Sequence, residues 1–157
     1  MDIPTPPAPP IARRRAILAE LAALRDPQQR LQWIVERART RLPLPESART
    51  DAHRVQGCMA RLWWVAEPRG NRWHLAADSD AVTLKALVGL IAECYDGETS
   101  HGILDDPPDF LERLGLLRQL AENRRATVLR VARSLVQQAM ESLPCPAPAP
   151  PCPGPLP

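Results

Sequence analysis

Apolar side chains recur at helical spacing in the N-terminal part of the chain. Ile11, Leu18, Leu21 and Leu24 fall on one face of a helix that begins near residue 11. The segment RDPQQRLQWIVERART predicts a second helix, because Asp26 is a favourable N-cap and proline suits the first helical position. We therefore expect two amphipathic helices, followed by the proline-broken loop RLPLPESART.

The pattern then changes to one that favours strands. Aromatic and β-branched residues at positions 63–65 favour a strand, PRGN is a turn signal, and RWHLAA is a plausible returning strand. Apolar residues on both faces of the first strand indicate that both faces are covered. This segment is expected to form an antiparallel hairpin.

The rest of the folded chain has helical spacing. DSDAVTLKALVGLIAECYDG predicts the longest apolar helix, with Asp78 or Ser79 as its cap and Gly97 as its stop. Short helices separated by prolines and a final helix ending near residue 143 follow. Because strands and helices are segregated along the chain, the predicted fold class is α+β, a small antiparallel sheet packed against several helices.

Proline marks both ends of the chain. Residues 1–10 and 144–157 are rich in proline and lack apolar periodicity, so they are expected to be disordered. Residues 11–143 are expected to form a single domain, as a length of 157 residues suggests.

Composition excludes several classes of protein. A net charge of +2 is too small to indicate a nucleic-acid partner, and no run approaches the ~18 apolar residues of a membrane helix. The N-terminus has an acid and prolines where a signal peptide has positive charge and an apolar core, which predicts a cytoplasmic protein. The run of arginines from Arg13 to Arg15 is expected to be a solvated face.

Four cysteines are present, at positions 58, 94, 145 and 152, and a cytoplasmic setting favours reduced thiols. No CxxC motif occurs, and the three histidines lack zinc-finger spacing, so no metal site is expected. Cys94 lies beside the apolar face of the long helix and is expected to be a core residue. Cys145 and Cys152 are expected to be bystanders in the tail.

Cys58 carries the clearest candidate chemistry. Gly57 before it permits a sharp or left-handed bend that could present the thiol on a loop tip. Arg54, Arg61 and His53 are near in sequence, and nearby cations favour the nucleophilic thiolate. Such a thiol can attack a sulfur–sulfur bond, and attack on the outer atom of a persulfide transfers sulfur. Two other interpretations stay open: a buried, inert cysteine, or a thiol hydrolase that pairs Cys58 with His53.

Three segments resemble the SufE family: VQGCMARLWWVAE, ADSDAVTLKALVGLIAECYDGETSHGIL and FLERLGLLRQLAENRRATVLR. The resemblance runs from about residue 16 to residue 140. It implies a SufE/IscU-like fold with about three antiparallel strands. It also implies a sulfur acceptor that stimulates a cysteine desulfurase in iron–sulfur cluster assembly. The chain departs from the family at Met59, where glutamine usually follows the cysteine.

The resemblance assigns roles to particular residues. Cys58 matches the persulfide-forming cysteine, and Gly57 is expected to be the hinge of a loop that can hide or present the thiol. Lys85 matches a lysine of the long helix. Supporting roles at the site or the partner contact are expected for His53, Gln56, Asp78, Asp80 and Arg124. Read from the residues alone, the two aspartates are cap and first-turn acids of the long helix.

The implied partners are a SufS-like cysteine desulfurase and a SufBCD-like scaffold, with no nucleic acid, no membrane and no cofactor beyond the transient persulfide. The protein is expected to be a sulfur-transfer partner and not itself an enzyme. Two alternatives remain: the same chemistry feeding RNA thiolation or another acceptor, and a non-catalytic interaction module with an inert Cys58.

Overall fold

The computed structural model describes residues 8–144 and residue 154. Its α-helices are α1 (Pro10–Ala23), α2 (Pro27–Arg39), α3 (Val82–Tyr95), α4 (Ser100–Asp105), α5 (Phe110–Arg113) and α6 (Glu122–Glu141). Short 3-10 helices span Glu46–Ala48, Asp51–His53 and Leu116–Gln119, and the strands are β1 (Leu62–Arg69) and β2 (Arg72–Ser79). Within the described residues, no helix combines the length and the apolar character that crossing a bilayer requires.

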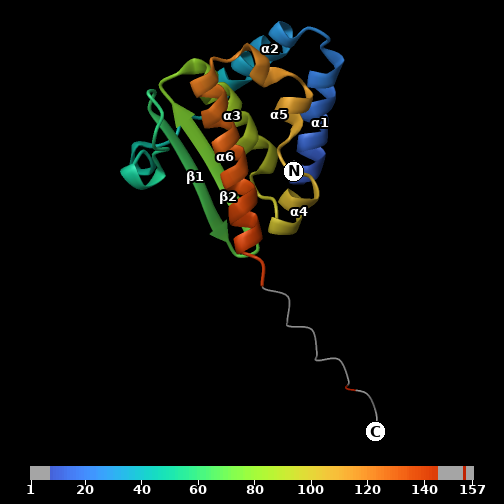
Figure 1. Ribbon diagram of the computed structural model, residues 1–157, viewed down its shortest axis with the longest axis vertical. Coiled ribbons are helices and arrows are strands. Elements are labelled where there is room, and N and C mark those ends of the chain that lie inside the picture. Colours follow the sequence, from blue (N-terminus) through green and yellow to red (C-terminus); the bar gives the residue numbers. More distant parts are fainter. Residues whose placement is uncertain (1–7, 145–153, 155–157) are drawn as a thin grey trace, which may run out of the picture.

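The two strands form the expected antiparallel hairpin (Figure 1). Their register runs from Leu62 opposite Ser79 to Arg69 opposite Arg72, and Gly70 in the turn has φ +64°. Only glycine adopts this left-handed conformation without a steric cost, which explains why PRGN ends the first strand. The turn lies at the opposite end of the hairpin from Cys58, which precedes β1.

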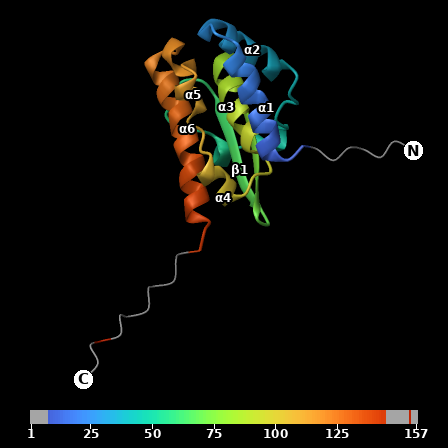
Figure 2. The same ribbon diagram turned by 90° about the vertical axis from the view of Figure 1, so that its right-hand side faces the viewer.

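Helix α3 forms the centre of the molecule and packs against β2, α1, α2 and α6. Figure 2 shows it between α6 and α1, with the sheet behind. A helix that is apolar around its whole circumference has to be covered on every side. Its buried residues are Leu84, Ala86, Leu87, Val88, Gly89, Leu90, Ile91, Ala92, Cys94 and Tyr95.

The α+β class is confirmed, but the expected third strand is absent from residues 8–144. The segment before β1 contributes only an isolated bridge, Arg54 opposite Trp63. A 3-10 helix ends at His53, directly before this bridge, and Gly57 turns the chain shortly after it. The segment is therefore too short and too curved to continue the sheet.

Two predictions about charged residues have opposite outcomes. Asp26 caps α2 as expected, because its side chain accepts a hydrogen bond from the Gln28 N–H at 2.9 Å. The run from Arg13 to Arg15, in contrast, is not a solvated face: only Arg15 is exposed. Arg14 is 1% exposed and forms ion pairs with Glu98 at 3.1 Å and Asp106 at 2.8 Å. These carboxylates lie more than eighty positions away in sequence, so no local pattern could indicate them.

Candidate functional site

Cys58 lies on a short loop at the entrance of β1, which we call the cysteine loop (residues 56–61). The base of the loop is closed by a hydrogen bond from the Val55 N–H to the Leu62 carbonyl, at 2.9 Å. The bridge between Arg54 and Trp63 continues this pairing by one residue. The loop is therefore anchored at both ends to the start of the strand.

The loop turns at Gly57 and directs Cys58 inward. Gly57 has φ +78°, as its position before the cysteine predicts. Cys58 is half-buried and packs against the hydrophobic core, together with Val55 and Ala60. Met59 points the other way and is 95% exposed. Cys58 therefore sits at the edge of the core, between two exposed residues, Gly57 and Met59.

Asp80 holds the end of the cysteine loop. Its carboxylate accepts a hydrogen bond from the Arg61 N–H at 2.9 Å and forms an ion pair with the Arg61 guanidinium at 3.3 Å. The Asp80 N–H in turn donates to the Arg61 carbonyl at 3.2 Å. Asp80 thus lies beside the site, and it precedes α3, which begins at Val82. Its function is not that of a first-turn acid.

Asp78 is buried and joins three segments. Its carboxylate accepts hydrogen bonds from the Leu44 N–H at 3.2 Å and from Arg49 at 2.7 Å, and Lys85 lies 3.5 Å away. Two residues that the resemblance singles out separately, Asp78 and Lys85, therefore form an ion pair in the structure. Asp78 is a strand residue and does not cap α3, where Ala81 occupies the N-cap position and no side chain caps the helix. Asp78 thus fixes to β2 both α3 and the loop after α2 that contains Leu44 and Arg49, which we call the proline-rich loop.

A different arginine from the expected one reaches the cysteine loop. Arg124 lies in the exposed first turn of α6, and the bond found there joins its backbone N–H to Asn123. Arg130, almost two turns further along the helix, donates from Nη1 to the Gln56 carbonyl at 2.5 Å. Gln56 thus takes part in the site through its backbone. Sequence reasoning did not find Arg130, and one arginine among many carried no signal of its own.

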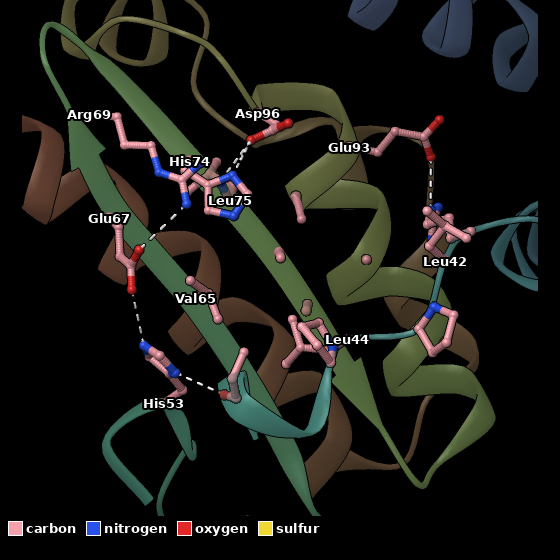
Figure 3. Close-up of a pocket in the computed structure, with 18 residues that line it drawn as sticks. Leu42, Leu44, His53, Val65, Glu67, Arg69, His74, Leu75, Glu93 and Asp96 are labelled. Atoms are coloured by element: carbon pink, nitrogen blue, oxygen red, sulfur yellow. Dashed lines mark hydrogen bonds and ion pairs between the residues drawn. The ribbon is translucent and has the colours of Figure 1, made fainter. Parts of the chain in front are cut away.

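Both ring nitrogens of His53 have partners other than the Cys58 sulfur. Its Nδ1 lies 2.9 Å from the Ala48 carbonyl oxygen, and its Nε2 lies 3.4 Å from the Glu67 carboxylate (Figure 3). Within residues 8–144 no hydrogen bond joins His53 to the Cys58 sulfur. The geometry therefore gives no support to the cysteine–histidine hydrolase considered from the sequence.

The cavity that His53 borders is separate from the cysteine loop. It has a volume of about 410 Å³ and lies between β2, α3 and the loop that contains Leu42 and Leu44 (Figure 3). Charged groups on its wall are paired with one another: His74 with Asp96 at 3.4 Å and Arg41 with Glu93 at 2.9 Å. No residue of the cysteine loop lines it, so it is not a shelter for the Cys58 thiol.

Cys94 is a core residue, as predicted. Its side chain is inaccessible, and burial raises the pKa of its thiol from 9.0 to about 12. Among the described residues, no group of three or more histidine, cysteine, aspartate or glutamate side chains has an arrangement that could hold a metal ion. Cys145 and Cys152, and the predicted disorder of the two ends, lie outside the described residues except for positions 8–10, 144 and 154.

Known proteins are similar to this chain in sequence, and a solved structure is similar in fold. An uncharacterized SufE-like protein of Synechocystis is 30% identical over 99 residues, which are 63% of this chain and 62% of that protein. A second, from Rhizobium meliloti, is 25% identical over 82% of this chain and 95% of its own length. The chain thus spans less than two thirds of the first relative and nearly all of the second.

Two further matches extend the comparison. The chloroplastic quinolinate synthase of Arabidopsis thaliana is 32% identical over 64% of this chain, which is only 14% of that protein. The solution structure of a hypothetical protein from Thermus thermophilus superposes with a TM-score of 0.61 at 27% identity, covering 86% of this chain and 99% of that one. The sequence model of the family described as "SufE: Fe-S metabolism associated domain" matches residues 15–139. This chain therefore belongs to the SufE family.

Proposed function

We propose that this protein is a sulfur acceptor and carrier that works with a SufS-like cysteine desulfurase. Cys58 takes the sulfane sulfur from the persulfide of the desulfurase, which stimulates that enzyme, and delivers the sulfur to a SufBCD-like scaffold for iron–sulfur cluster assembly. The protein acts as a transfer partner, and its chemistry needs no resident cofactor.

The chemistry is a thiol–persulfide exchange. The Cys58 thiolate attacks the outer sulfur of the donor persulfide, the bond between the two donor sulfurs breaks, and the donor cysteine leaves as a thiolate. Cys58 then carries the persulfide, and no net oxidation occurs. The proposal depends on one observation above all, the half-buried thiol on a loop that turns at a left-handed glycine.

The placement of Cys58 suits a labile group. A thiol at the edge of the core can be partly shielded from solvent, yet the residues on either side of Cys58 are exposed. A small change at the loop is enough to present it, and no rearrangement of the sheet or helices is needed. Deeply buried Cys94 offers no such route, because its high pKa and lack of exposure keep it an unreactive thiol.

The test is sulfur loading in a defined mixture. The full chain is incubated with a pyridoxal-phosphate-loaded cysteine desulfurase and cysteine, and its intact mass is measured. A gain of one sulfur atom is expected for the wild type and for Cys94→Ala, and none for Cys58→Ser. An unchanged wild-type mass under turnover would refute the carrier proposal and favour the interaction module with an inert cysteine. Cross-linking of the loaded carrier to candidate acceptors then separates cluster assembly from RNA thiolation.

A further inference from the structure

The guanidinium group of Arg130 lies directly against the backbone of the cysteine loop. Its Nη1 donates to the Gln56 carbonyl at 2.5 Å, and a Cβ atom added to Gly57 would lie 3.1 Å from the same nitrogen. Arg130 therefore covers the two residues that precede Cys58. This hydrogen bond joins α6 to the cysteine loop, although Arg130 and Gln56 are 74 positions apart in sequence.

Among the described residues, the bond from Arg130 is the only hydrogen bond that the middle of the cysteine loop receives from outside the loop. The base of the loop is closed by Val55 and Leu62, and its end is fixed by Asp80 on Arg61. Between these anchors, no other hydrogen bond reaches residues 56–60 from outside the loop, within the described chain. The position of the segment around Cys58 thus depends on Arg130 and on the packing of Cys58 and Ala60 against the core.

Arg130 is also available to a partner. Arg130 is exposed, and so is Arg54, which precedes Gln56 by two residues. In residues 8–144 neither arginine forms an ion pair with a carboxylate. The present acceptor of Arg130 is a neutral carbonyl. A carboxylate is a charged acceptor that can bind guanidinium through two parallel hydrogen bonds, so a carboxylate brought to this surface would compete well with the neutral Gln56 carbonyl for Arg130.

We propose that Arg130 is a positioning residue, a latch that holds the cysteine loop closed over Cys58 until a carboxylate of a docking partner replaces the Gln56 carbonyl. The identity of that partner as a desulfurase rests on the proposed function; the latch itself does not. Transfer of Arg130 to the carboxylate frees the backbone at Gly57 and lets the thiol turn outward. The partner surface that fits this site is therefore acidic.

The latch is tested on the isolated full chain by comparing Arg130→Ala with Arg133→Ala. Arg133 is exposed on the same helix, so both variants lose the same charge, but only Arg130 bonds to the loop. Cys58 is alkylated with neutral iodoacetamide, and the mass of its own peptide is followed so that other cysteines do not contribute. Loss of the hydrogen bond is expected to raise the rate about three- to tenfold in Arg130→Ala and to leave Arg133→Ala at the wild-type rate.

The direction in which the alkylation rate of Cys58 changes distinguishes the latch from a purely electrostatic role of Arg130. If Arg130 only favoured the thiolate by its charge, its removal would slow alkylation. An unchanged or slower rate in Arg130→Ala would therefore overturn the latch. Amide hydrogen exchange at Gly57, Cys58 and Met59 should accelerate in parallel, and the unaltered thermal midpoint of the variant would show that the fold is kept.

A second variant tests the trigger. Arg130→Lys keeps the charge and one donor, and it is expected to restore slow alkylation in part, because a single ammonium group lacks the planar fork of arginine. In the sulfur-loading assay, Arg130→Ala should require a higher carrier concentration for half-maximal loading, with loading at saturation unchanged. Wild-type half-saturation in Arg130→Ala would overturn the acidic trigger. Failure of the wild type to load would refute the carrier function and leave the alkylation result standing.

Discussion

Gly57 has a backbone conformation that a residue with a side chain avoids. Its φ of +78° is costly for any L-amino acid, and Arg130 occupies the space that a Cβ atom would need. Gly70 has a similar φ of +64° but no neighbouring atom within 4 Å. Substituting alanine at Gly57 and at Gly70 therefore distinguishes the cost of backbone strain, which both variants share, from displacement of Arg130, which only Gly57→Ala can cause.

We predict that Gly57→Ala and Gly70→Ala each lower the free energy of unfolding by about 1–2 kcal/mol. Only Gly57→Ala should also speed the alkylation of Cys58, because the methyl group pushes Arg130 away from the loop. Urea unfolding and peptide-resolved labelling measure the two effects. Equal labelling rates in both variants would contradict the close contact with Arg130.

Cys94 gives a prediction about alkaline pH. Burial raises the pKa of its thiol to about 12, and burial also raises the pKa of Tyr95 above its usual value. A group whose pKa is higher in the folded state stabilises the protein below its unfolded value and loses that contribution as pH rises toward the folded one. Stability should therefore fall between about pH 9 and pH 12, and Cys94→Ala should show a shallower fall in urea unfolding at the same pH values. Parallel curves would be inconsistent with a protonated, buried thiol.

At the scale of elements, two aspartates at the end of β2 hold neighbouring segments in different ways. Asp78 is buried and joins the proline-rich loop, Arg49 and Lys85, whereas Asp80 is half exposed and holds the cysteine loop through Arg61. Loss of a buried carboxylate leaves its partners without an acceptor inside the protein, while an exposed pair is replaced by water at little cost.

We predict that Asp78→Ala lowers the free energy of unfolding by about 2–4 kcal/mol, and Asp80→Ala by less than about 1 kcal/mol. Urea titrations of both variants measure this difference directly. Because Asp80 receives the Arg61 N–H, its loss should still loosen the end of the cysteine loop, which amide exchange at Arg61 detects. A small stability loss for Asp78→Ala would mean that the proline-rich loop is held by other contacts.

Over the whole molecule, Arg14 ties α1 to the far end of α3 and to α4. Its guanidinium group bonds to Glu98, Asp106 and the Cys94 carbonyl, and it stacks on the Tyr95 ring at 4.6 Å. Desolvation disfavours the charge, but the hydrogen bonds that Arg14 donates to Asp106 and Glu98 outweigh it, so the pKa of Arg14 is raised. A buried charge held by ion pairs in this way is costly to disrupt from one side.

We predict that Arg14→Met destabilises the protein by about 3–5 kcal/mol, because it leaves Glu98 buried without a cation. Arg15→Met, one position along the same helix and exposed, should change little. The double variant Arg14→Met with Glu98→Gln should recover part of the loss, which a double-mutant cycle of urea unfolding quantifies. No recovery would assign the effect to Asp106 or to lost packing.

The parts of the fold that depend on local pattern could be predicted from the sequence. The hairpin at PRGN, the capped start of α2 and the buried Cys94 all follow from spacing and turn chemistry. The absent third strand, the buried Arg14 and the contact of Arg130 with Gln56 join residues far apart in the chain, so no window of sequence contains them. Gly57 and Cys58 make the candidate site predictable from sequence, whereas the long-range contacts that hold the cysteine loop in place are not.

The closed base of the cysteine loop limits how far the sulfur can travel. With Val55 bonded to Leu62 and Arg61 held by Asp80, only residues 56–60 are free to swing, and half of such a segment reaches at most about 10 Å when extended. A tether this short cannot bridge two bound proteins. Donor and recipient must take turns on one small patch, so an excess of either should slow delivery to the other.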